Sequence, residues 1–137
     1  MRNTFFEQQK DGLLLLARIL LMLLFIIFGW SKLTGFSGTV AFFTADGVPL
    51  PEISTVIAVV MEFFVGIALL VGFWTRPLAL LMALYTLGTA LLGHHFWSMT
   101  DGARMMNEIN FFKNISIIGG LFALAAAGPG RYSIDKR

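Results

Sequence analysis

Glu62 is the residue of this sequence best placed to do chemistry, because it stands alone in a long apolar stretch. It lies about midway along residues 53–73, and nothing close in the sequence neutralises it. A charge in hydrocarbon costs at least about 2.5–3.5 kcal/mol, so a residue of this kind needs a partner or a function. Three roles are open: an ion pair that fixes helix docking, a proton-transfer or substrate-binding group, and a protonated hydrogen-bond donor.

Arg18, inside the first apolar stretch, is the predicted partner of Glu62. Because a helix rises about 1.5 Å per residue, Arg18 should lie about 8 Å from one membrane boundary and Glu62 about 15 Å from the other. The long arginine side chain can bridge much of the remaining gap. We expect this intramembrane charge pair to form in the bundle interior, directly, through water or through Tyr85.

A second polar set is predicted at the other membrane boundary, made of Lys32, His94, His95, Asn110, Lys113 and Asn114, with Glu108 nearby. Adjacent helical residues point about 100° apart, so one histidine faces the interior, and we expect it to be His95. Such a mouth suits the polar ring of a quinone or similar amphiphile; equally, its residues could simply face water. The candidate ligand or proton site is therefore Lys32, Glu62, Tyr85, His95 and Asn114. No metal site is predicted.

The composition indicates which solvent surrounds these residues. The chain has 137 residues, of which 57% are hydrophobic and 13% charged. A soluble domain this small needs nearly twice that charge to cover its surface. The ten Lys and Arg form no basic run, so nucleic-acid binding is not expected, and the absence of cysteine excludes thiol chemistry and disulfides. No phosphate loop, dinucleotide fingerprint or nucleophile elbow is present, and we do not expect an enzyme that acts alone.

Four stretches are long and apolar enough to cross about 30 Å of hydrocarbon as helices. They are residues 13–31, 53–73, 77–95 and 110–127. The sequence therefore predicts one all-α domain over residues 1–137, a transmembrane four-helix bundle. A short interfacial helix is expected between the first two spans, and residues 96–109 are expected to form a polar loop.

The basic residues predict the orientation, because loops rich in Lys and Arg stay in the cytoplasm. One side receives Arg2, Lys10, Arg76, Arg131, Lys136 and Arg137, with Arg18 slightly inside the membrane, whereas the other receives Lys32, Arg104 and Lys113. Both termini are therefore expected in the cytoplasm. Trp30, Trp74 and Trp97 each fall at a span end, as interfacial anchors do.

The order of short motifs along the chain resembles the DoxX family of small bacterial membrane proteins. The segments that carry the resemblance are residues 17–19, 28–33, 47–49, Glu62 with Gly66 and Gly72, and residues 75–77, 112–114 and 128–135. The resemblance is closest to the YphA-like branch, through residues 85–90 and 93–95. It covers nearly the whole chain.

This resemblance implies a multi-pass protein of the bacterial inner membrane, connected with quinones, oxidative stress and electron transfer. It extends to Arg18, Lys32, Glu62, Arg76, His95, Asn114 and Asp135, with Arg76 and Asp135 expected to be structural on the cytoplasmic side. The leading hypothesis is a protein that binds a quinone-like molecule or serves a membrane oxidoreductase as an accessory subunit, with a redox partner or a second copy of itself. The alternatives are a purely structural subunit of a larger complex and a small transporter.

Overall fold

The computed structural model describes residues 7–136 of the chain, and this part is mainly helical, without strands. Its elements are η1 (Glu7–Gln9), α1 (Lys10–Thr34), α2 (Phe36–Ala45), α3 (Pro51–Val59), the π-helix η2 (Val60–Val65), α4 (Gly66–Val71), α5 (Thr75–Gly93), η3 (Phe96–Ser98) and α6 (Asp101–Ala127). Four helical segments, Glu7–Thr34, Pro51–Val71, Thr75–Ser98 and Asp101–Ala127, are long and apolar enough to cross a membrane. The predicted all-α four-span fold is confirmed.

The outward surface of these segments explains why the protein needs lipid. In the most apolar window of each segment only 11–39% of the residues are buried. Large apolar side chains such as Leu20, Leu84 and Phe122 are more than half exposed along the helices. In water this surface would be strongly unfavourable, whereas in a bilayer it is an ordinary lipid-facing surface.

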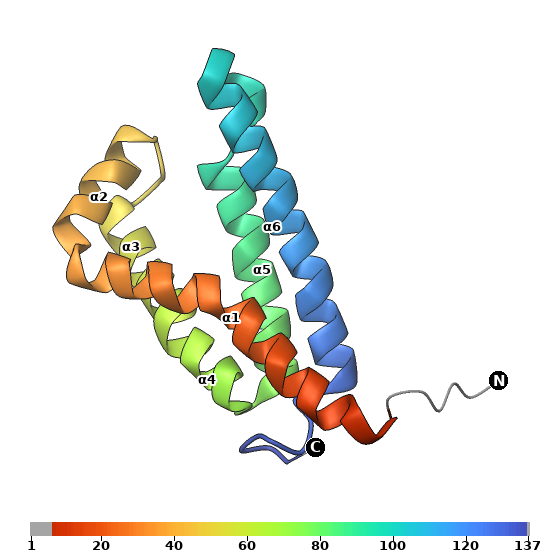
Figure 1. Cartoon of the computed structure of the whole chain (residues 1–137). Helices are drawn as coiled ribbons and strands as arrows, with labels where there is room; N and C mark the ends of the chain where they lie inside the picture. The colour runs from red at the N-terminus through yellow and green to blue at the C-terminus, as the bar shows by residue number, and fades with distance from the viewer. Residues whose placement is uncertain (1–6, 137) are drawn as a thin grey trace.

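The helices form two groups that meet at one end of the molecule (Figure 1). Helices α5 and α6 run side by side as one pair, while α1 packs along α3, η2 and α4. The groups meet where α5 contacts η2 and α4, and α1 contacts α6. Helices α2 and α3, by contrast, contact neither α5 nor α6, so the two groups diverge away from the chain termini. We call the convergent end the terminal end and the other the loop end.

Helix α1 crosses the molecule obliquely, and α2 continues from its end toward the loop end beside α3 (Figure 1). Gly29 allows the close crossing of α1 over η2: a Cβ there would lie 2.6 Å from the Phe63 backbone nitrogen and 2.8 Å from the Glu62 carbonyl carbon. The expected short helix between the first two spans is present as α2. The last turn of α1, which carries Lys32, consequently lies beside the middle of the second span.

The segment after α6 closes the terminal end. Pro129 is fully buried, and Ile134 and Asp135 donate backbone hydrogen bonds to the Val71 and Gly72 carbonyls, at 3.0 and 2.9 Å. Gly72 has a φ of +74°, and a Cβ there would lie 2.3 Å from that of Ser133, so glycine is required for the docking. The tail thereby joins the end of α4 to the rest of the bundle.

Two boundaries differ from the sequence-based prediction. Helix α5 ends at Gly93 rather than at residue 95, and α6 begins at Asp101, so most of the predicted loop 96–109 is helical. Hydropathy identifies only the apolar part of a helix, and the first turns of α6 are polar. A helix pairs its backbone groups internally whether lipid or water surrounds it, so α6 can extend past the apolar stretch.

Candidate functional site

Glu62 is the centre of a hydrogen-bonded triad inside the bundle. Its Oε1 accepts a hydrogen bond from Lys32 Nζ at 2.9 Å, and its Oε2 accepts one from the Tyr85 hydroxyl at 2.5 Å. The three residues come from α1, η2 and α5, at the point where the two helix groups meet. Glu62 lies near the midpoint of its span and Tyr85 near the midpoint of its own, so we expect the triad close to the middle of the bilayer.

Local backbone structure places Glu62 in this position. It sits in the six-residue π-helix η2, whose wider turns interrupt the α-helical register between α3 and α4. Short π-helical segments inside α-helices are rare and occur frequently at functional sites. Lys32 follows Gly29 by three residues on α1, so the close helix crossing also brings the ammonium group to the carboxylate.

The triad balances its charges and is only partly enclosed. One carboxylate faces one ammonium group, and their attraction offsets part of the cost of burying either charge. The Glu62 side chain is 10% exposed, whereas that of Lys32 is 24% exposed. Glu62 keeps lone pairs and Lys32 keeps N–H donors for a further partner, because an ammonium group has three donors and a carboxylate about four acceptor positions. The arrangement can therefore hydrogen-bond a polar ring and exchange a proton with it.

The predicted pair between Arg18 and Glu62 is not formed. Arg18 is fully buried, but its guanidinium donates to the backbone carbonyls of Leu70 and Tyr132. Asp135 also interacts with it electrostatically. Fourteen residues separate Arg18 from Lys32 along α1, about 21 Å of helix, so Arg18 lies near the terminal end, well below the level of the triad. Tyr85, considered as a bridge to Glu62, does contact the carboxylate.

Asn114 lies on the loop-end side of the triad. Its Nδ2 donates to Thr89 Oγ1 at 3.1 Å, and Thr89 is one helical turn beyond Tyr85 on α5. The structure thus brings Lys32, Glu62 and Tyr85 together and places Asn114 on an adjoining wall formed by α5 and α6.

His95 does not join the site. Because α5 ends at Gly93, the two histidines are not successive helical residues, and the predicted helical geometry does not apply. His95 Nδ1 lies 3.0 Å from the Leu92 carbonyl oxygen of its own chain segment, and its ring contacts Trp97. It is His94 that reaches across to α6, with Nδ1 2.9 Å from Asn107 Oδ1.

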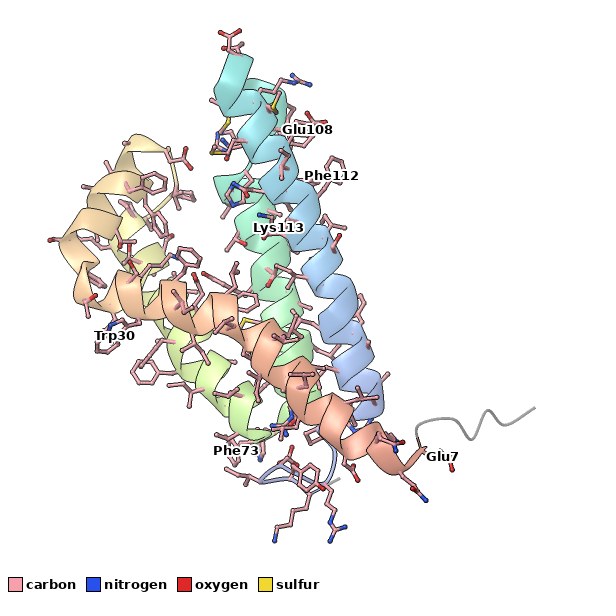
Figure 2. All side chains as sticks on the ribbon, in the orientation of Figure 1. Glu7, Trp30, Phe73, Glu108, Phe112 and Lys113 are labelled. Carbon is pink, nitrogen blue, oxygen red and sulfur yellow. The ribbon has the colours of Figure 1, made fainter. Side chains whose placement is uncertain are left out.

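The remaining members of the predicted mouth separate from one another. Lys113 lies seven residues before Gly120 and therefore on the same face of α6. A Cβ at Gly120 would contact Leu21 of α1, so this face of α6 is turned toward α1. Figure 2 shows Lys113 and Phe112 leaving α6 in different directions, with Glu108 further toward the loop end. Lys32, predicted at this mouth, lies with Glu62 instead, because α1 is oblique and ends beside η2.

Arg76 and Asp135 make structural contacts at the terminal end. The Arg76 guanidinium donates to the Ala125 and Ala126 carbonyls, at 3.0 and 2.6 Å, where α6 ends. The Asp135 carboxylate accepts from the backbone N–H groups of Trp74 and Thr75, at 3.0 and 2.9 Å, and so caps α5. A surface hollow lies beside these groups, lined by Trp74, Thr75, Arg76, Pro77, Pro129 and Asp135, and it is remote from the triad.

Three features of the site were missed from the sequence. The π-helix has no established sequence signature, and Thr89 is not part of the predicted site. Asn107 could have been found, because Asn107, Asn110 and Asn114 follow the i, i+3, i+7 spacing of one helix face. This spacing groups all three asparagines along α6.

A membrane bundle of four spans, with a paired carboxylate at its centre, is the class of protein that the fold and the triad define. Comparison with known proteins then identifies the family, because the DoxX family model matches residues 13–95. The chain belongs to the DoxX family and is an inner membrane protein.

Its relatives include two proteins of Escherichia coli. Inner membrane protein YphA is 53% identical over 132 residues, which cover 96% of this chain and 94% of that protein. Inner membrane protein YqjF is 44% identical over 133 residues, covering 95% of each. The ER-derived vesicles protein ERV29 of Saccharomyces cerevisiae is 26% identical over 131 residues, only 35% of its own length. No solved structure matches the chain significantly.

Proposed function

We propose that this protein binds a lipophilic molecule with a polar, quinone-like ring at the Lys32–Glu62–Tyr85 triad, and acts as an accessory protein in membrane redox metabolism. The observation that carries this proposal is the intramembrane carboxylate, which holds two donors at 2.9 and 2.5 Å while its lysine partner stays 24% exposed. The partly exposed lysine leaves N–H donors that a ligand can reach.

The chemistry of the triad matches a ring that carries carbonyl or hydroxyl groups. A ring carbonyl accepts a hydrogen bond from the Lys32 ammonium, and a ring hydroxyl can donate to the Glu62 carboxylate or to the Tyr85 oxygen, whose own proton is engaged by Glu62. Such a ring changes its proton content when it is reduced or oxidised, and a carboxylate beside it can supply or accept that proton. Because the chain has no cysteine, thiols of this chain cannot supply the electrons.

The arrangement of the helices provides a route for a ligand dissolved in the bilayer. Helix α3 contacts neither α5 nor α6, although all three lie at membrane depth. A lipophilic molecule can therefore approach between the two groups from the loop-end half of the bilayer, with its ring at the triad and its tail among the lipid chains.

Thermal unfolding of the detergent-purified protein with a short-chain quinone tests the proposal. A ligand that binds only the folded state stabilises it, by about 2.7 kcal/mol at one hundred times its Kd. We expect a higher Tm for the wild type, a much smaller shift for Tyr85→Phe, and an undiminished shift for Tyr132→Phe. Tyr132 is a matched control, because its side chain is 56% exposed at the terminal end. No shift at saturating quinone, or equal shifts in both variants, contradicts the proposal.

Glu62→Gln separates ligand chemistry from simple helix docking. The amide retains the shape of the carboxylate and can still accept hydrogen bonds, but it cannot take up a proton. A folded variant that has lost the quinone-induced shift supports a binding role. A variant whose shift equals that of the wild type shows that the carboxylate serves packing alone.

We also infer that the terminal end faces the cytoplasm. Lys10, Arg76, Arg131 and Lys136 lie there, whereas Lys32 is engaged at mid-span by Glu62. With Lys32 removed from the loop-end count, the excess of positive charge at the terminal end is larger than the sequence alone suggested.

A further inference from the structure

The contact between α5 and α6 has two halves of opposite character. Toward the terminal end it is apolar, with Ala79, Met82, Leu121 and Leu124 in the buried core. Toward the loop end a line of polar side chains follows the contact, and we call it the polar file: Tyr85, Thr89 and His94 from the α5 side, and Asn107, Asn110 and Asn114 from α6. The file begins at Glu62 and ends at the loop-end surface.

Three side-chain contacts join the file at separate levels. Tyr85 donates to Glu62 at 2.5 Å, Asn114 donates to Thr89 at 3.1 Å, and His94 meets Asn107 at 2.9 Å. All three asparagines are partly buried, whereas Phe112 and Lys113 between them on α6 are exposed. The asparagines therefore occupy the inward face of α6 rather than its exposed surface.

The spacing between levels suits single water molecules. Successive asparagines are three and four residues apart, about 4.5 and 6.0 Å along the axis. A water molecule that makes hydrogen bonds of about 2.8 Å on both sides spans such a gap. Buried water requires two to four polar partners, and each step of the file offers side-chain amides and hydroxyls as well as carbonyls. The apolar half of the contact offers no comparable partners.

We propose that the polar file is a hydrated proton path that connects Glu62 to the aqueous phase at the loop end only. A proton enters from water near His94 and Asn107 and passes along waters held by Asn110 and Asn114. It then reaches the Glu62 carboxylate beside Tyr85, and the carboxylate becomes neutral. The reverse sequence releases it to the same side. The Met82–Leu121–Leu124 core closes the path toward the terminal end.

The titratable groups that face Glu62 come from two helices. Lys32 of α1 and Tyr85 of α5 are the titratable groups in contact with it within residues 7–136. Helix α4 contributes no titratable side chain, and within residues 7–136 Lys113 of α6 makes no ion pair or hydrogen bond with the carboxylate. This proposal deepens the proposed function, since it names the proton supply of the same site, but its main test requires no quinone.

Cysteine accessibility tests the path directly, because the natural chain contains no cysteine. Single variants Asn110→Cys and Asn114→Cys, in sealed vesicles of known orientation, are treated with a small charged methanethiosulfonate from either side. Ile115→Cys is the matched control, one residue further along α6 and facing lipid. Because the thiolate is the reactive form and needs water, we expect both file positions to react at least about tenfold faster than the control, and only from the loop end.

Two outcomes overturn the proposal: file cysteines as unreactive as Ile115→Cys, or reaction from the terminal end. Two file positions are used so that the result survives if one variant misfolds. A second measurement follows Glu62 itself with a hydrophobic carbodiimide, which modifies protonated carboxyls. Its rate should rise when the loop-end solution alone is acidified; a rate that follows the terminal-end solution contradicts the path. A quinone that fails to bind leaves both readouts intact, so the two proposals fail separately.

Discussion

Among single residues, Lys32 and Glu62 have the largest expected effect on the stability of the bundle centre. Removal of one partner leaves a charge in the membrane without compensation, whereas replacement of both by apolar residues can be neutral or stabilising. We expect Lys32→Met to lower the unfolding free energy by about 1–3 kcal/mol, less than for a fully buried pair because Lys32 is partly exposed. The Lys32→Met/Glu62→Leu double variant should recover most of the loss, as measured by denaturation in mixed micelles.

Lys113→Met is the control for this cycle, since Lys113 makes no ion pair or hydrogen bond within residues 7–136. Its stability should stay within about 0.5 kcal/mol of the wild type. If Lys113→Met is as destabilising as Lys32→Met, the pair has no special role.

At the scale of elements, the crossing of α1 over η2 depends on Gly29. Even the methyl group of alanine would lie 2.6 Å from the backbone of Phe63, so the two helices must separate. We expect Gly29→Ala to cost about 1–3 kcal/mol, the usual range for an overfilled contact. Gly88→Ala is the matched control, because a Cβ there meets no atom within 4 Å. Thermal unfolding of both variants measures the difference; equal melting points would show that the crossing is loose.

The same crossing explains what could be predicted from the sequence. Hydropathy located all four spans, and the isolated position of Glu62 identified the centre of the candidate site. The partner was assigned wrongly because depth was calculated for upright helices, whereas α1 is oblique and brings its last turn to mid-span. Lys32 and Tyr85 belonged to the predicted site. Residue spacing alone could not reveal that Lys32, rather than Arg18, pairs with Glu62, nor that α5 ends at Gly93 and leaves His95 outside the site.

The terminal segment is the second element on which stability depends. Deletion of residues 128–137 removes the Tyr132 carbonyl from Arg18 and the Asp135 cap from α5. We expect a loss of about 3 kcal/mol or more, since Arg18 becomes a buried charge without adequate partners. Arg18→Met in the truncated chain should restore part of this stability, as judged by Tm in detergent. A further loss in the double variant would show that Arg18 contributes independently of the tail.

At the scale of the whole molecule, the orientation in the membrane decides which compartment the loop end meets. We expect both termini in the cytoplasm, and therefore the polar file opens to the opposite side. A fluorescent protein fused to the C-terminus should fluoresce, and alkaline phosphatase fused at the same place should be inactive. Active phosphatase at the C-terminus would invert the orientation and the side from which Glu62 receives protons.

Photolabelling tests directly whether a quinone binds at the triad. The wild-type protein in membranes is labelled with a photoreactive quinone, and its peptides are analysed by mass spectrometry. We expect the labels to concentrate on the segments around Lys32, Glu62 and Tyr85. An excess of unlabelled short-chain quinone should abolish this labelling. Labels spread over the lipid-facing surface, or gathered at the terminal end and insensitive to competition, would contradict a binding site at the triad.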